Sequence, residues 1–207
     1  MSAFPDIDPA NDLLERARAG DLQALEQLYE LFERPVRTLA LRLLAHRAAA
    51  EDVAQDVFVD VMTRLHQYEG RGSFAGWVRS IAVSRCLMHL RSPWQRSRRW
   101  LVRAVDGGDD GAVSNEHLPG LPETPVLPGH DDSIDLQRAL ARIGDTARAV
   151  VWLHDVEGYT HAEIGRLFGA TASFSKSQLA RAHERLRAEL HCAPVDSDPC
   201  MSPSTIS

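Results

Sequence analysis

The spacing of apolar residues predicts a chain made of helices. Leucine, valine and phenylalanine recur every three or four positions through residues 10–92, as they do on one face of an α-helix. Capping and turn residues divide this stretch into helices at about residues 11–19, 22–43, 49–68 and 73–92. The candidate caps are Asn11 or Asp12 for the first helix, Asp21 for the second and Ser73 for the fourth. Pro35 lies inside the second, where we expect it to kink the helix or to begin a new one. The stretch is long enough to bury its own core, so we expect one domain here, preceded by a disordered N-terminus at residues 1–9.

Helical spacing resumes at residues 133–190, which we expect to form a second small helical domain. Its last two helices are joined by a short turn that contains Gly169. Thr160 and Glu163 form a capping box at the start of the first, and Ser173 can cap the second. A short helix, a tight turn with glycine and a longer basic helix are typical of the helix-turn-helix motif.

The second helix of this motif is the candidate DNA-reading element. Such a helix fits the major groove, where its early residues meet base edges and its cations meet phosphates. The residues that we place at its start or on its outward face are Ser173, Ser175, Lys176, Gln178, Arg181 and Arg185. The alternative is an ordinary helical hairpin whose charged face is only solvated.

Charge alternates along the chain more than its formal net charge of −6 suggests. Residues 79–105 contain 7 arginines and no acid, whereas residues 106–135 contain 8 acids and no basic residue. Because glycine and proline interrupt the acidic stretch, we predict a flexible acidic linker at residues 93–132. We predict a disordered tail at residues 191–207. Alternating charge of this kind indicates separate surfaces for separate partners.

The sequence predicts neither catalysis nor a cofactor. Its three cysteines match no disulfide framework or zinc pattern, and we find no nucleophile–base pair and no phosphate-binding glycine loop. We expect Phe74, Trp77 and Cys86 to be core residues. The N-terminus lacks the apolar core of a secretory signal, and no run reaches the ~18 apolar residues of a membrane span. We therefore expect a cytoplasmic protein without direct membrane insertion.

Residues 50–91 and 136–190 resemble the bacterial RNA polymerase sigma factors of the sigma-70 family, in the extracytoplasmic-function (ECF) subgroup. The resemblance implies an all-α fold. A sigma region 2-like domain at residues 10–92 and a region 4-like helix-turn-helix domain at residues 133–190 would be joined by the acidic linker. It also implies a transcription initiation factor, not an enzyme, that binds core RNA polymerase and directs it to specific promoters. Such a factor recognises −10 and −35 promoter elements and assists promoter opening.

The resemblance also assigns roles to single residues. Asp52, Gln55 and Asp56 lie on one helix face and match the positions that dock onto the clamp helices of the polymerase. The residues that match the −10-binding region are Tyr68, Arg71, Arg79, Arg85 and Arg91. Among these, we expect Arg85 and Arg91 to face DNA most directly. The helix that begins at Ser173 would read the −35 element.

Several residues depart from the family pattern. Ser84 and Met88 replace an asparagine and an acidic residue that are common there, and Gly165 replaces an alanine, which permits closer helix packing. Phe174 and Ser175 replace the usual Thr-Val at the start of the −35-reading helix. The departures at Ser84, Met88, Phe174 and Ser175 bear on promoter preference rather than on the fold.

Family members commonly have an anti-sigma factor as a partner, so the resemblance implies one here as well. Two alternatives to a working sigma factor stay open. A stand-alone helix-turn-helix DNA-binding regulator would bind a pseudo-palindromic operator as a dimer, without polymerase. A decayed sigma-like protein would act only by protein–protein interaction.

Overall fold

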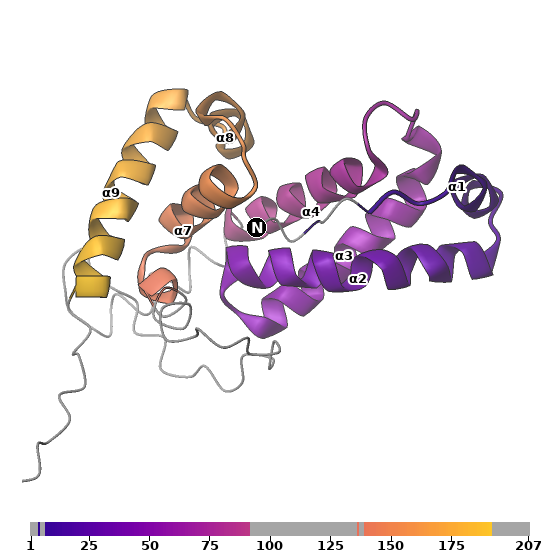
Figure 1. Cartoon of the computed structure of the whole chain (residues 1–207), viewed down its shortest axis with the longest axis horizontal. Coiled ribbons are helices and arrows are strands. Elements are labelled where there is room, and N and C mark those ends of the chain that lie inside the picture. Colours follow the sequence, from indigo (N-terminus) through magenta and orange to yellow (C-terminus); the bar gives the residue numbers. More distant parts are fainter. Residues whose placement is uncertain (1–3, 5–6, 92–135, 137–138, 192–207) are drawn as a thin grey trace, which may run out of the picture.

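The computed structural model describes residues 4, 7–91, 136 and 139–191 of the chain, and the regular elements in this described part are all helices (Figure 1). The first module contains α1 (Asn11–Arg18), α2 (Leu22–Leu44), α3 (Arg47–Arg64), the 3-10 turn η1 (Leu65–Gln67) and α4 (Phe74–Arg91). The second contains α7 (Asp145–Val151), the π-helix η2 (Trp152–Val156), α8 (His161–Phe168) and α9 (Ala172–His191). The predicted all-α fold is confirmed. The predicted linker at residues 93–132 and most of the predicted tail lie outside the described residues.

Side-chain caps explain where several of these helices begin. The carboxylate of Asp21 accepts hydrogen bonds from the first turn of α2, and the hydroxyl of Ser73 accepts one from the backbone of Gly76 at the start of α4. The capping box of Thr160 and Glu163 is present at α8, as predicted. These caps satisfy backbone N–H groups that lack partners within the first turn of a helix.

Three helix boundaries differ from the predictions. One helix runs from Leu22 to Leu44 with Pro35 inside it, so the proline does not begin a new helix, and buried residues on both sides of it pack in the core. No side chain caps α1, so Asn11 and Asp12 are not its cap. The last helix begins at Ala172 rather than after Ser173, because the hydroxyl of Thr171 accepts the hydrogen bond from the N–H of Phe174.

The core of the first module lies between α2, α3 and α4. Phe32 and Phe74 are buried and meet edge to face, with ring centroids 5.5 Å apart. Phe4 packs against Phe32 with its ring centroid 6.5 Å away and is itself buried, so the prediction of a disordered N-terminus is wrong at this residue. Cys86 is buried in α4, as predicted, and burial raises the pKa of its thiol to about 12.

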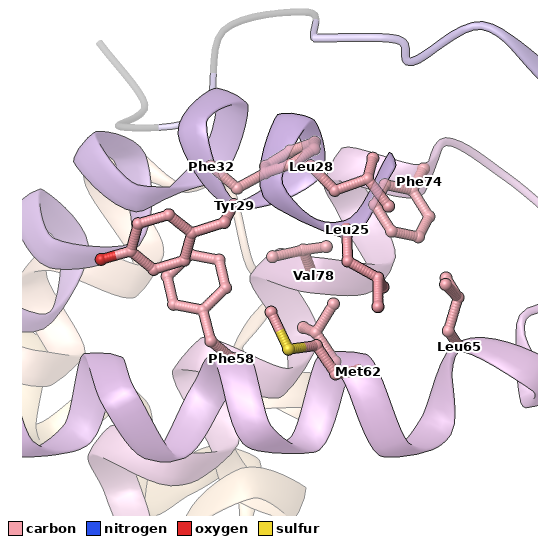
Figure 2. A pocket seen from close by; sticks show the side chains of 10 residues that line it. Leu25, Leu28, Tyr29, Phe32, Phe58, Met62, Leu65, Phe74 and Val78 are labelled. Atoms are coloured by element: carbon pink, nitrogen blue, oxygen red, sulfur yellow. The ribbon is translucent and has the colours of Figure 1, made fainter. Parts of the chain in front are cut away.

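A shallow apolar hollow opens between α2 and α3 (Figure 2). Leu25 and Tyr29 point into it from α2, and Phe58 and Met62 approach them from α3. The rings of Tyr29 and Phe58 lie 4.6 Å apart, so the hollow is largely closed by aromatic packing. Tyr29 of α2 and Met62 of α3 nevertheless remain exposed, at 42% and 43%, so apolar surface from both helices lies at the edge of the hollow.

The helix-turn-helix depends on a close approach of α8 to the turn before α9. Gly169 ends α8 with φ at +64°, in the left-handed region that glycine adopts without strain. A Cβ atom on Gly165 would lie 2.8 Å from the carbonyl carbon of Thr171. Gly165 therefore lets the backbone of the turn lie directly against α8.

The two modules also touch each other. Helix α7 packs against α2, and α8 packs against α4, and Figure 1 shows α7 and α8 beside the first module with α9 farther out. The buried apolar residues of both modules belong to one hydrophobic cluster. In the described part of the chain, no helix is long and apolar enough to cross a membrane.

The close contact at Gly165 predicts that replacing this glycine with alanine lowers the stability of the protein. Helix propensity alone favours Gly165→Ala by about 1 kcal/mol. Overpacking against the backbone of the turn costs about 1–3 kcal/mol, so we expect a net loss of stability in denaturant unfolding of the second module. The exposed Ala162→Gly in the same helix measures the propensity effect separately. A gain in stability from Gly165→Ala would contradict the close approach.

Candidate polymerase and DNA interfaces

The acidic face of α3 has the exposure that docking requires. Asp52, Gln55 and Asp56 are exposed, whereas Val53 and Val57 on the other side of the helix are buried in the core. The three polar residues therefore share one outward side, as their spacing predicts. Asp56 also lies 3.9 Å from a guanidinium nitrogen of Arg85 in α4, so the acidic face reaches the edge of the next helix.

Arg85 is held within the first module by a buried carboxylate. Asp60 is 7% exposed and accepts a hydrogen bond from Nε of Arg85, and Arg64 lies 3.3 Å from its other oxygen. The hydrogen bond from Arg85 lowers the pKa of Asp60, and the same contact raises the pKa of Arg85. The expectation that Arg85 faces DNA directly is therefore wrong for this conformation, because its guanidinium is directed to Asp60.

Tyr68 is a core residue in this structure rather than an exposed base-stacking residue. It is 8% exposed, and its ring centroid lies 5.1 Å from that of Phe74 and 5.6 Å from that of Trp77. Its hydroxyl donates to the carbonyl of Gly72 at 2.7 Å. Arg18 covers the ring at 5.8 Å and donates to the Tyr68 carbonyl. The prediction that Tyr68 is available to DNA is corrected by this packing.

The other three candidates for the −10 surface differ in accessibility. Arg71 is exposed in the loop before α4, where it pairs with Glu69. Arg91 is exposed at the end of α4 and donates to the carbonyl of Leu87 at 3.2 Å. Arg79 is partly covered and points to the second module. The structure therefore leaves Arg71 and Arg91 as the accessible cations among the predicted −10 residues.

Most of the predicted −35 residues lie on the outer side of α9. Ser173, Lys176, Arg181 and Arg185 are exposed, and Gln178 is half-buried. Ser175 is an exception. It is 0% exposed, and its hydroxyl lies 3.1 Å from Nδ1 of His161 in α8.

The outward placement of Ser175 is therefore wrong. It follows the start of α9 by less than one turn, on the side that packs against α8. Its hydrogen bond with His161 joins the two helices of the motif. In this structure the Ser175 side chain therefore faces α8 and not the outer side of α9.

A cluster of histidines behind the motif was not expected from the sequence. The rings of His154 and His161 stack with centroids 4.5 Å apart. Asp155 lies 2.8 Å from Nδ1 of His154 and 2.7 Å from Nε2 of His183, so it links η2 to α9. Burial raises the pKa of Asp155, but the hydrogen bonds from both histidines outweigh it and the net shift is downward. Residues so far apart in sequence give no periodic signal that would reveal such a cluster.

Comparisons with known proteins identify the family. The model of sigma-70 region 2 matches residues 28–96, and the model of sigma-70 region 4 matches residues 133–186. The chain is 32% identical to the ECF RNA polymerase sigma factor SigM of Mycobacterium tuberculosis, across 84% of this chain and 81% of SigM. It belongs to the ECF group of the sigma-70 family. This sigma factor is therefore a transcription initiation factor and not an enzyme.

Other relatives agree with this assignment. The sigma factor is 30% identical to ECF RNA polymerase sigma factor SigE of Mycolicibacterium smegmatis, across 81% of this chain and 63% of SigE. Among solved structures, it resembles the sigma factor RpoE in complex with the anti-sigma factor NepR from Bartonella quintana. The TM-score is 0.55 at 20% identity, with 84% of this chain and 100% of that chain covered. At this identity the likeness supports the fold.

The Asp60–Arg85 pair predicts a pH-dependent contribution to stability. The folded-state pKa of Asp60 is lowered, so the ion pair stabilises the protein above the unfolded-state pKa of about 4. That contribution is lost as the pH falls through the folded-state pKa. We expect Asp60→Asn to reduce the free energy of unfolding by about 1–3 kcal/mol at pH 7, and by less as the pH falls below about 4.

The matched control is Glu51→Gln, which removes a carboxylate from the exposed pair with Arg47 in the same helix. Exposed pairs contribute little, so its effect should stay within about 0.5 kcal/mol at any pH. An equal loss of stability for Asp60→Asn at pH 7 and at pH 3 would exclude a role for the charge of Asp60.

Proposed function

We propose that this sigma factor binds core RNA polymerase in the cytoplasm and places it on a restricted set of promoters. The first module, assigned to residues 10–92, would meet polymerase and the −10 element. The second, assigned to residues 133–190, would meet the −35 element. The observation that carries the proposal is the pairing of two exposed surfaces of opposite charge on separate modules: the acidic face of α3 and the basic outer side of α9.

The acidic face suits a basic partner helix. Asp52, Gln55 and Asp56 are followed on the same side of α3 by Val59 and Met62, which are 61% and 43% exposed. Charged residues give a protein interface its orientation, and exposed apolar residues give it buried area. A stripe that changes from acidic to apolar over three turns fits a protein surface better than it fits nucleic acid, because phosphates would be repelled.

The DNA-contacting residues are proposed from exposure and charge. On the second module, Lys176, Arg181 and Arg185 would meet phosphates, and Gln178 would reach a base edge. On the first module, the exposed cations Arg71 and Arg91 would meet DNA directly. Arg79 and Arg85 would reach DNA only after leaving their carboxylate partners.

An anti-sigma factor is a further proposed partner. The solved RpoE is bound to the anti-sigma factor NepR, and its fold resembles that of this chain. A protein that covers the acidic face of α3 would prevent polymerase from docking there. The same charge that suits a basic helix of polymerase would suit a basic segment of such an inhibitor.

Docking through α3 can be tested without disturbing Asp56, which also contacts Arg85. We expect Asp52→Arg with Gln55→Arg to weaken binding to core polymerase by about 100-fold, because like charges would then oppose each other. The measurement is affinity for purified core enzyme, together with transcription from fragmented genomic DNA with mapped starts. Wild-type protein should yield discrete starts, and the variant should yield none.

The control is Gln27→Arg with Glu30→Arg, which likewise replaces one glutamine and one acidic residue three positions apart, on exposed positions of α2. It should leave affinity and transcription unchanged. Equal losses in both variants would show a general charge effect instead of a docking face. Wild-type protein that neither binds core enzyme nor directs any start would refute the proposed function and favour a stand-alone regulator or a decayed sigma-like protein.

The salt dependence of binding tests the phosphate contacts of α9. Lys176→Ala should reduce the slope of log affinity against log salt by about 1, measured on duplex DNA of mixed sequence at low salt. Ser177→Ala is the matched control one residue away, because its side chain is exposed and carries no charge. It should leave the slope unchanged. Identical slopes for Lys176→Ala and wild type would remove Lys176 from the DNA surface.

A further inference from the structure

The loop between η1 and α4 carries Arg71, one of the two accessible cations among the predicted −10 residues. Gly70 and Gly72 lie on either side of it, with φ angles of +75° and +79°. Glycine adopts this region without strain, but it also loses the most conformational freedom when it is ordered. Within the described part of the chain, residues 69–72 form no hydrogen bond between backbone groups. The loop therefore needs contacts from neighbouring side chains to keep one conformation.

Tyr68 holds both ends of this loop. Its own backbone is the first end, where its N–H donates to the carbonyl of Leu65 at 3.2 Å. Its hydroxyl donates to the carbonyl of Gly72, at the other end, at 2.7 Å. The ring between these two points packs against Phe74 and Trp77, so the hydroxyl is held in one place. The path of the loop therefore depends on where Tyr68 lies.

Arg18, in the last turn of α1, binds Tyr68 from the opposite side. Its Nη2 atom donates to the carbonyl of Tyr68, and its guanidinium lies 5.8 Å from the centroid of the tyrosine ring. The first contact is a hydrogen bond from a charged donor and the second is a cation–π contact, and both are stronger than their uncharged counterparts. Glu15, one turn earlier, lies 3.8 Å from Nη1 of the same arginine. One side chain therefore binds both the backbone and the ring of Tyr68.

Helix α1 is itself fixed to the core, so it can serve as the support for the loop. Leu14 and Ala17 are buried and anchor its inner side, and α1 packs against both α2 and η1. Figure 1 shows α1 and the loop before α4 at the same end of the first module, away from the second module. Arg18 thus transmits the position of a packed helix to a loop that has little structure of its own.

The exposed part of the loop is its cation. Arg71 pairs with Glu69 within the loop, and exposed pairs of this kind are weak, so a nucleotide can displace the carboxylate. A loop that became ordered only when it met DNA would lose affinity, because ordering costs conformational entropy at the moment of binding. A loop that is already held has met this cost during folding.

We propose that Arg18 is a positioning residue for the −10 contact. From α1 it holds Tyr68, and through Tyr68 it holds residues 69–72 in the conformation that presents Arg71 to the opened promoter strand. Arg18 acts through the loop and not by touching DNA. Its role at the promoter rests on the proposed function of the first module, whereas the order of the loop can be measured in the free chain, without polymerase or DNA.

The first test measures the order of the loop by NMR relaxation of the free full chain. Arg18→Met keeps an apolar stem over the ring and removes the donors, and Tyr68→Phe keeps the ring and removes the hydroxyl. The backbone order parameters of Gly70 and Gly72 should lie near the rigid value of about 0.85 in the wild type. They should fall below about 0.6 in either variant, because each variant releases the loop.

The matched control is Arg16→Met, which makes the same change of charge in the same helix. It removes the ion pair with Asp21 and none of the printed contacts of Tyr68 involve it, so the order parameters of Gly70 and Gly72 should match those of the wild type.

The second test measures promoter opening by the reactivity of unpaired thymines toward permanganate. The template is the promoter with the strongest start that wild-type protein and core polymerase produce on fragmented genomic DNA. Arg18→Met should slow opening about tenfold, the effect of losing one hydrogen bond from a charged donor, and should leave affinity for core polymerase unchanged. Combining it with Tyr68→Phe should slow opening little further, because both changes release the same loop. Arg16→Met should open the promoter at the wild-type rate.

Order parameters that stay near about 0.85 in both variants would overturn the hold of Arg18 on the loop, whatever the transcription results. A loop that loosens without slowing promoter opening would overturn its role at the promoter. An equal loss of core affinity and of opening rate would show a general structural effect instead of positioning. If wild-type protein directs no start at all, the proposed function fails and the promoter role of Arg18 fails with it, while the order parameters still decide whether Arg18 holds the loop.

Discussion

The packing of α2, α3 and α4 around Phe32 and Phe74 is the constraint on which the rest of the molecule depends. A helix that gives one side to a core has only its other side for partners. In α3, Val53 and Val57 are buried, so Asp52, Gln55 and Asp56 face outward. The position of α4 follows from the same core, and with it the positions of its arginines. The side of a helix that packs in the core therefore determines which of its residues can contact partners. A residue on the buried side contributes to the core, and a residue on the opposite side is available for binding.

The arginines of the first module can pair with carboxylates inside the chain or with phosphates of a partner. A guanidinium presents a fork of N–H donors that fits a carboxylate and a phosphate equally well. Arg85 directs this fork to Asp60 inside the first module, and Arg79 directs it to Glu157 of the second. The surface that the free chain offers to DNA is therefore less basic than a count of arginines suggests. Together with a net charge of −6, this favours weak binding of the free chain to DNA.

Features that depend on residues close together in the chain could be predicted from the sequence. The caps at Asp21 and Ser73, the capping box before α8 and the left-handed Gly169 all follow from residues within one turn. Features that depend on distant segments were missed. A helical period places Ser175 on a side of α9 but does not reveal that α8 covers that side. Likewise, the aromatic cluster around Tyr68 is assembled from a loop and α4, so its burial could not be read from spacing.

Because the two modules belong to one chain, a few weak contacts are sufficient to hold them together. Two separate proteins joined only by the Arg79–Glu157 pair and the Arg148–Leu43 contacts would associate weakly, because association costs translational and rotational freedom. In one chain that cost has largely been met, and the second module is present at an effective concentration on the order of millimolar. Contacts too weak to hold a complex are then sufficient to hold a closed chain. Within the described residues, Nε of Arg79 and Nε1 of Trp152 are buried without a hydrogen-bond partner, which limits how strongly these contacts hold the modules together.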